Sequence, residues 1–69
     1  MDNKLLSKFP KKHQPYIIDC GKEVHANRTR YFAVIKFNDG FSRSIGESNL
    51  EELKYYIKQI IEVDRTIEF

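Results

Sequence analysis

The sequence is poor in the residues on which cross-links and membrane segments depend. Its 69 residues include one cysteine, no tryptophan, two prolines and three glycines. The single cysteine, Cys20, excludes an internal disulfide, and no apolar run reaches the length of a signal peptide or a membrane span. The many Ile, Lys and Asn residues are typical of an AT-rich genome, such as that of a Gram-positive bacterium or its phage. We therefore expect a cytoplasmic protein of a bacterium or of a phage-infected host.

The sequence also lacks a set of side chains that could catalyse a reaction or hold a metal. Cys20, His25 and His13 do not have the spacing of zinc ligands, and a fourth ligand is missing. Glu51 and Glu52 are adjacent on an expected helix, so their carboxylates point apart and cannot share a proton or a metal. We expect no enzymatic activity, no cofactor and no metal, with Cys20 buried and both histidines on the surface.

The apolar content is sufficient for one small hydrophobic core. Hydrophobic residues make up 41% of the chain, and nine residues are aromatic (five Phe and four Tyr). A chain of this length buries only about 60% of its unfolded surface, which leaves no apolar material for a second core. Residues 1–69 are therefore expected to form a single domain.

The first half of the chain predicts a short helix followed by a strand. Leu5, Leu6 and Phe9 have helical spacing, Asp2 or Asn3 can cap the helix, and a proline stops it. A polar connector then leads to β-branched and aromatic residues. The expected elements are a helix over 3–9, a strand over 16–20 that continues over 22–26 past a bulge at Gly21, and a turn over 27–30.

The strongest strand pattern is Tyr31–Phe37, and the Asn38-Asp39-Gly40 turn after it predicts a bulged hairpin in which Phe37 faces Phe41. Strand side chains alternate between the two faces of a sheet. The expected core face carries Tyr31, Ala33, Ile35, Phe37, Phe41 and Ile45. The expected outer face carries Arg30, Phe32, Val34, Lys36, Ser42 and Ser44. Arg43 falls on the core side, so it must lie near an edge with its charge in water.

The last helix is predicted by a capping box formed by Ser48 and Glu51, and it should run to about Val63. Its apolar stripe consists of Leu50, Leu53, Ile57, Ile60 and Ile61, widened by Tyr56. The fold expected for the whole chain is α+β, in the order α-β-β-β-α, with this helix packed on one face of a three-stranded antiparallel sheet.

In this order the chain resembles a double-stranded-RNA-binding domain. The matching features are the leucine-rich first helix, Pro15-Tyr16, Gly21 and His25 in the first hairpin, the aromatic-led second strand, and Gly46 to Ser48 before the last helix. The resemblance implies RNA contacts from Lys4 and Lys8 and from His25 and Arg28. The family's lysines after the helix-entry serine are replaced by Asn49, Leu50 and Leu53, so low affinity is expected.

A weaker resemblance is to the amino-terminal arm-type DNA-binding domains of phage and transposon integrases. These read DNA with the open face of a three-stranded sheet, which here would carry Arg30, Phe32, Val34 and Lys36.

Charge is distributed unevenly. Residues 1–46 carry nine Lys or Arg and four Asp or Glu, whereas residues 47–69 carry three and six. We expect a non-enzymatic protein that engages structured nucleic acid through its basic half. The candidate contacts are Lys4, Lys8, Lys11, Lys12, His25 and Arg28.

The alternative function is a phage or mobile-element protein that inhibits a host or defence protein. Its interface would be the acidic helix at Glu51 and Glu52, or the outer sheet face at Arg30, Phe32, Val34 and Lys36. Because Phe32 and Val34 would form an exposed apolar patch, a homodimer through this face is a further expectation.

Overall fold

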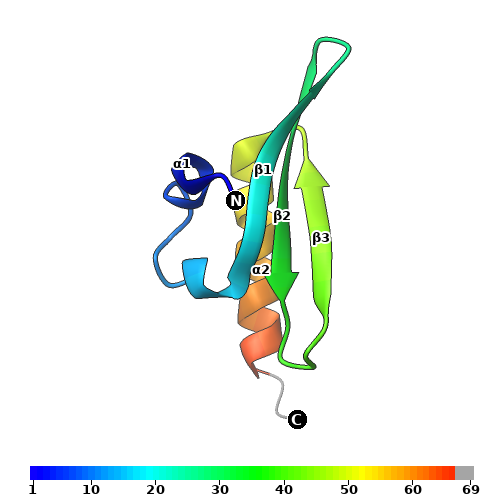
Figure 1. Ribbon diagram of the computed structural model, residues 1–69. Coiled ribbons are helices and arrows are strands. Elements are labelled where there is room, and N and C mark those ends of the chain that lie inside the picture. The colour runs from blue at the N-terminus through cyan, green and yellow to red at the C-terminus, as the bar shows by residue number, and fades with distance from the viewer. Residues whose placement is uncertain (67–69) are drawn as a thin grey trace.

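The computed structural model describes residues 1–66, which form a helix, a three-stranded sheet and a second helix (Figure 1). The strands are antiparallel and lie in the order β1-β2-β3. The elements are α1 (Asn3–Leu6), a 3-10 turn η1 (Gln14–Tyr16), β1 (Ile17–His25), β2 (Arg28–Lys36), β3 (Ser42–Glu47) and α2 (Leu50–Thr66). The α-β-β-β-α order and the α+β class predicted from the sequence are confirmed.

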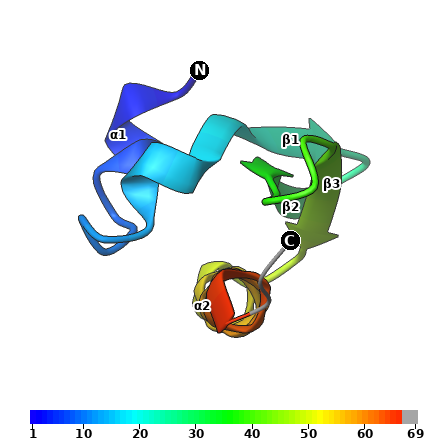
Figure 2. The ribbon, with the colours of Figure 1, turned by 90° about the horizontal axis from the view of Figure 1, so that it is seen from below.

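The core lies between one face of the sheet and α2. Figure 2 shows α2 beneath the sheet and α1 beyond β1, so that the opposite face of the sheet carries neither helix. The buried apolar side chains of this core come from α1, β1, β2, α2 and the segment just after α1. They are Leu5, Phe9, Ile17, Cys20, Ala33, Ile35, Leu53, Ile57 and Ile61.

The β2–β3 hairpin forms as its turn sequence predicts. The Phe37 amide donates to the Phe41 carbonyl at 2.9 Å, and the Gly40 amide donates to the Phe37 carbonyl at 3.1 Å. Gly40 has a φ of 89°, the left-handed conformation that glycine adopts without strain. Ala33 is buried as expected, but Phe41 is 69% exposed because it lies in the turn ahead of β3, so its assignment to the core was wrong.

Arg43 lies at the edge of the sheet, as its position on the core side requires. Its guanidinium stands 4.5 Å from the centre of the Phe37 ring and 3.5 Å from an Asp39 carboxylate oxygen. The guanidinium therefore stacks on the aromatic ring at the surface, where its charge remains in water.

The β1–β2 hairpin is longer and more regular than predicted. The pairing shifts at Ile18, so the bulge lies there and Gly21 stays in register opposite Phe32. Ala26 and Asn27 form a two-residue turn with φ values of 47° and 67°, the signs that a type I′ hairpin turn requires. The turn predicted over 27–30 is therefore shorter and one residue earlier. Since β3 pairs only as far as Tyr31, the rest of this hairpin projects as an arm (Figure 1).

The N-terminal segment is more compact than the sequence indicates. The Asp2 carboxylate caps α1 by accepting from the Leu5 amide at 3.0 Å, but α1 has only four residues. The Pro10 carbonyl accepts from the amides of His13 (2.9 Å) and Gln14 (3.2 Å), which turns the chain back toward the core. His13 is consequently only 2% exposed, and its prediction as a surface residue was wrong.

Helix α2 begins one residue later than predicted, because Asn49 caps it. The Asn49 Oδ1 atom accepts from the amides of Glu51 (2.8 Å) and Glu52 (3.4 Å). The helix extends to Thr66 rather than to about Val63. In its predicted stripe, Leu53, Ile57 and Ile61 are buried and Leu50 and Ile60 are partly buried, but Tyr56 is 46% exposed.

Asn49→Ala is expected to lower the free energy of unfolding by about 1 kcal/mol, because it removes the side-chain acceptor at the N-cap. Ser48→Ala is the matched control and should leave the stability nearly unchanged. Thermal melts of both variants measure the difference. A larger loss of stability for Ser48→Ala would mean that Ser48 is the N-cap residue, as the capping box predicts.

Candidate nucleic-acid interface

The outer face of the sheet carries a row of five side chains from β2. Arg28, Arg30, Phe32, Val34 and Lys36 alternate with the core residues along the strand, so they share the face that neither helix covers (Figure 2). The structure thus brings Arg30, Phe32, Val34 and Lys36 together, as the alternation predicts. The neighbouring strands add Asp19, Gly21, Glu23 and His25 from β1 and Ser42, Ser44 and Gly46 from β3.

Two glycines, which lack a Cβ atom, leave room for the central side chains of this row to lie against the sheet. A Cβ atom on Gly21 would lie 2.7 Å from the Phe32 ring, and a Cβ atom on Gly46 would lie 2.5 Å from Nε of Arg30. Phe32 therefore leans over β1, and Arg30 leans over β3. Together they spread an aromatic ring and a guanidinium across all three strands.

The charged side chains on the outer face have a net positive charge. The Asp19 carboxylate lies 3.4 Å from the Met1 amine, and the Glu23 carboxylate lies 3.8 Å from the His25 ring. Within residues 1–66, by contrast, no carboxylate forms an ion pair with Arg28, Arg30 or Lys36. Three cations therefore share this face with two carboxylates, and none of the three is held in an ion pair within the described part of the chain.

Gly21→Ala is expected to destabilise the domain by about 1 to 3 kcal/mol, because the new methyl group overlaps the Phe32 ring. Gly46→Ala is the matched control: its methyl meets the flexible end of Arg30, which can swing aside. Urea unfolding of both variants measures the difference. Equal losses would mean that the Phe32 ring does not rest on Gly21.

The six predicted nucleic-acid contacts fall into two separate regions. Lys4, Lys8, Lys11 and Lys12 are exposed on α1 and the connector, and Lys12 lies 3.9 Å from the Glu62 carboxylate. His25 and Arg28 are paired residues at the tip of the β1–β2 arm (Figure 1). Only the second group is continuous with the row on the outer face.

The exposed side of α2 combines acidic and aromatic groups. Glu51 and Glu52 are both exposed in its first turn, and Glu51 lies 3.4 Å from Lys54. Tyr55 is 60% exposed and packs edge to face against Tyr56, with 5.9 Å between the ring centres. Sequence reasoning missed this tyrosine pair, although the position of Tyr55 outside the apolar stripe was a usable signal.

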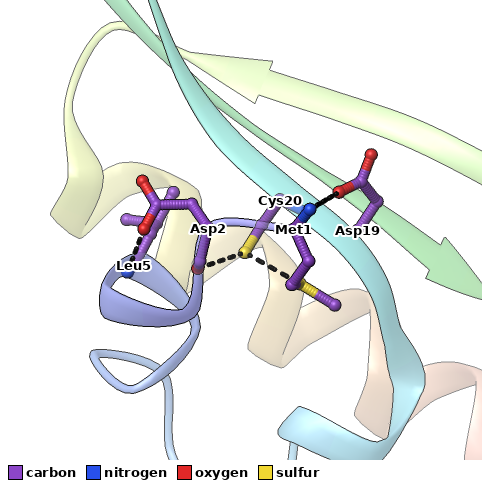
Figure 3. Close-up of polar contacts among 5 residues, drawn as sticks. All are labelled: Met1, Asp2, Leu5, Asp19 and Cys20. Atoms are coloured by element: carbon purple, nitrogen blue, oxygen red, sulfur yellow. Dashed lines mark hydrogen bonds and ion pairs between the residues drawn. The ribbon is translucent and has the colours of Figure 1, made fainter.

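Cys20 lies on the core side of β1, where the N-terminal residues cover it (Figure 3). Its thiol donates to the Asp2 carbonyl at 3.4 Å and lies 3.6 Å from the sulfur of Met1. Burial raises the pKa of the Cys20 thiol, and the carboxylates of Asp2 and Asp19 raise it further. The thiol is therefore protonated at neutral pH, and it does not face His25, which lies on the opposite side of the sheet.

Two kinds of feature are absent from residues 1–66. No three His, Cys, Asp or Glu side chains gather closely enough there to hold a metal ion. No helix in that range has the length and apolar character needed to cross a membrane.

Comparisons with protein-family models, with curated proteins and with solved structures found no match to this chain.

Proposed function

We propose that this protein binds duplex DNA against the outer face of its sheet. One observation carries the proposal: Arg28, Arg30 and Lys36, which make no ion pair within residues 1–66, flank Phe32 on a face that neither helix covers. Clustered cations bind nucleic acid by displacing the counterions around its phosphates. Phe32 and Val34 beside them are partly exposed, which leaves apolar surface for a ligand to cover.

The dimensions of the face suit a DNA major groove. Neighbouring strands lie about 4.8 Å apart, so the backbones of three strands span about 10 Å, less than the groove width of about 12 Å. Arg28 and Lys36 lie at opposite ends of the row, about 26 Å apart for eight extended residues, so they can reach phosphates on both sides of the groove. Phe32 and Val34 at the centre can contact thymine methyl groups, and Arg30 beside them supplies a third cation for a phosphate.

The same features favour DNA over duplex RNA. The major groove of A-form RNA is deep and narrow, and it does not admit a sheet. Recognition in the manner of the double-stranded-RNA-binding domains would need a longer first helix and cations at the start of the last one. In this chain α1 has four residues, and α2 begins with Asn49, Glu51 and Glu52.

Fluorescence anisotropy with DNA and RNA duplexes of the same sequence, over a salt series, tests the proposal. DNA should bind more tightly, and its log Kd should rise linearly with log salt concentration. Equal affinity for both duplexes, or no binding to either, would sink the DNA proposal.

A second candidate function is supported by the tyrosine pair on α2. Tyr55 and Tyr56 form an exposed aromatic patch beside Glu51 and Glu52, and tyrosines on an exposed surface are enriched at protein interfaces. The corresponding function is inhibition of a host or defence protein that presents a basic surface.

Charge reversal separates this candidate from the first. In a nuclease-treated host lysate, wild-type protein should capture a protein that the Glu51→Lys/Glu52→Lys double variant does not capture, because complementary charge selects the partner. The matched control neutralises Arg28, Arg30 and Lys36 and should leave that capture intact. Loss of capture in the control alone would place the interface on the sheet and overturn the candidate.

A further inference from the structure

The outer edge of β3 is an open edge of the sheet. No strand lies beyond β3, and within residues 1–66 no hydrogen bond from another segment reaches that edge (Figure 1). The opposite edge is closed at Cys20, whose carbonyl accepts from the Asp2 amide at 3.0 Å and whose amide donates to Asp19 at 2.9 Å. Edge strands with unpaired backbone groups are templates for pairing with another strand.

The hydrogen bonding of the β2–β3 hairpin determines which backbone groups of β3 point away from β2. The Phe37 amide donates across to the Phe41 carbonyl, so alternate β2 residues from Phe37 to Tyr31 direct their backbone groups toward β3. The backbone amides and carbonyls of their partners, Arg43, Ile45 and Glu47, are directed toward β2. Ser42, Ser44 and Gly46 therefore present their amides and carbonyls to the open edge.

The side chains of β3 are complementary to a second copy of the same strand. If two β3 strands run antiparallel with Ile45 facing Ile45, each Ser44 lies opposite a Gly46, and both of these residues have outward backbone groups. In the same register each Arg43 lies opposite a Glu47. Glu47 forms no ion pair within residues 1–66, and the side chain of Arg43 is 58% exposed. The two neighbouring registers that also match backbone groups place Ile45 opposite Arg43 or opposite Glu47, and neither pairs Arg43 with Glu47.

We propose that two copies of this chain associate through β3 in this register to form one continuous six-stranded sheet. Four backbone hydrogen bonds join Ser44 and Gly46 across the interface, and two ion pairs join Arg43 and Glu47. The two Ile45 side chains meet at the two-fold axis. An interface related by such an axis is self-complementary, as closed dimers require. This association does not depend on nucleic acid, so it stands or falls separately from the proposed function.

Sedimentation equilibrium over a wide concentration series is the first test. The apparent mass should approach twice the 8.2 kDa of the chain. Arg43→Glu and Glu47→Arg, each alone, place like charges opposite each other twice and should weaken association about tenfold or more. The double variant restores opposite charges and should recover the wild-type dissociation constant. The contacts of Arg43 with Asp39 and Phe37 lie within one chain, and the double variant does not restore them, so recovery reports on the interface.

Cross-linking tests the register. Facing residues at a non-hydrogen-bonded position have Cα atoms about 4.5 Å apart, within reach of a disulfide. Ile45→Cys should therefore cross-link two chains in oxidised glutathione. Ser44→Cys is the matched control: the two Ser44 positions lie diagonally, beyond the 7 Å limit, and should not cross-link. Buried Cys20 is common to both variants. A chain that stays monomeric, a dimer unchanged by both single reversals, or faster cross-linking of Ser44→Cys overturns the proposal.

Discussion

Replacing Arg28, Arg30 and Lys36 together by glutamine is expected to make the salt dependence of duplex DNA binding shallower by about three units of slope. Each phosphate contact contributes about 0.9 to the slope of log K against log salt concentration, so three lost contacts give this change. The three side chains lie on an exposed face and are unpaired within residues 1–66, so the fold should survive the replacement. Anisotropy titrations at four or more salt concentrations measure the slope.

The matched control removes the same number of charges elsewhere. Lys4, Lys8 and Lys11 belong to α1 and the connector, so their replacement by glutamine should leave the slope nearly unchanged. A larger decrease of the slope in this control than in the sheet variant would mean that the N-terminal lysines form the contact surface.

The largest expected loss of stability comes from Ile57→Ala, at about 3 kcal/mol. Ile57 is 0% exposed on the middle of α2, and its truncation removes buried methyl groups and leaves a cavity against the sheet. A domain of this length has a free energy of unfolding of about 3 to 10 kcal/mol, so the variant should keep about 0 to 7 kcal/mol and unfold at a much lower urea concentration. Urea unfolding measures the change.

Tyr55→Ala is the control for this prediction. It lies two residues away on the same helix but is mostly exposed, so its loss should be below about 1 kcal/mol. Similar losses for the two variants would mean that α2 does not pack through Ile57.

The parts of the fold that were predictable depend on local patterns. The Asn38-Asp39-Gly40 turn specifies the length of the loop that joins β2 and β3, and the loop length specifies the register of the two strands. The register matters because a slip by one residue would move every side chain to the wrong face of the sheet. The row on the outer face follows from this register without any tertiary information. The stripe of α2 follows equally from helical periodicity.

The errors come from competition between local signals of similar strength. Ser48 and Asn49 are both good N-cap residues, and the choice of Asn49 decides which backbone amides are satisfied. His13 is polar, but the turn at Pro10 carries it into the core. The seating of Phe32 on Gly21 joins two strands, and neither strand's sequence alone indicates it.

An NMR titration of isotopically labelled protein with a DNA duplex tests the central claim most directly. The ring of Phe32, Nε of Arg30 and the amides of the outer face should shift together and saturate, while the signals of Lys4, Lys8 and Tyr55 stay in place. The sheet, α1 and α2 occupy different parts of the domain (Figure 2), so the pattern identifies the contact surface. Shifts confined to α1 and the connector, or to the exposed side of α2, would contradict the assignment of DNA binding to the sheet.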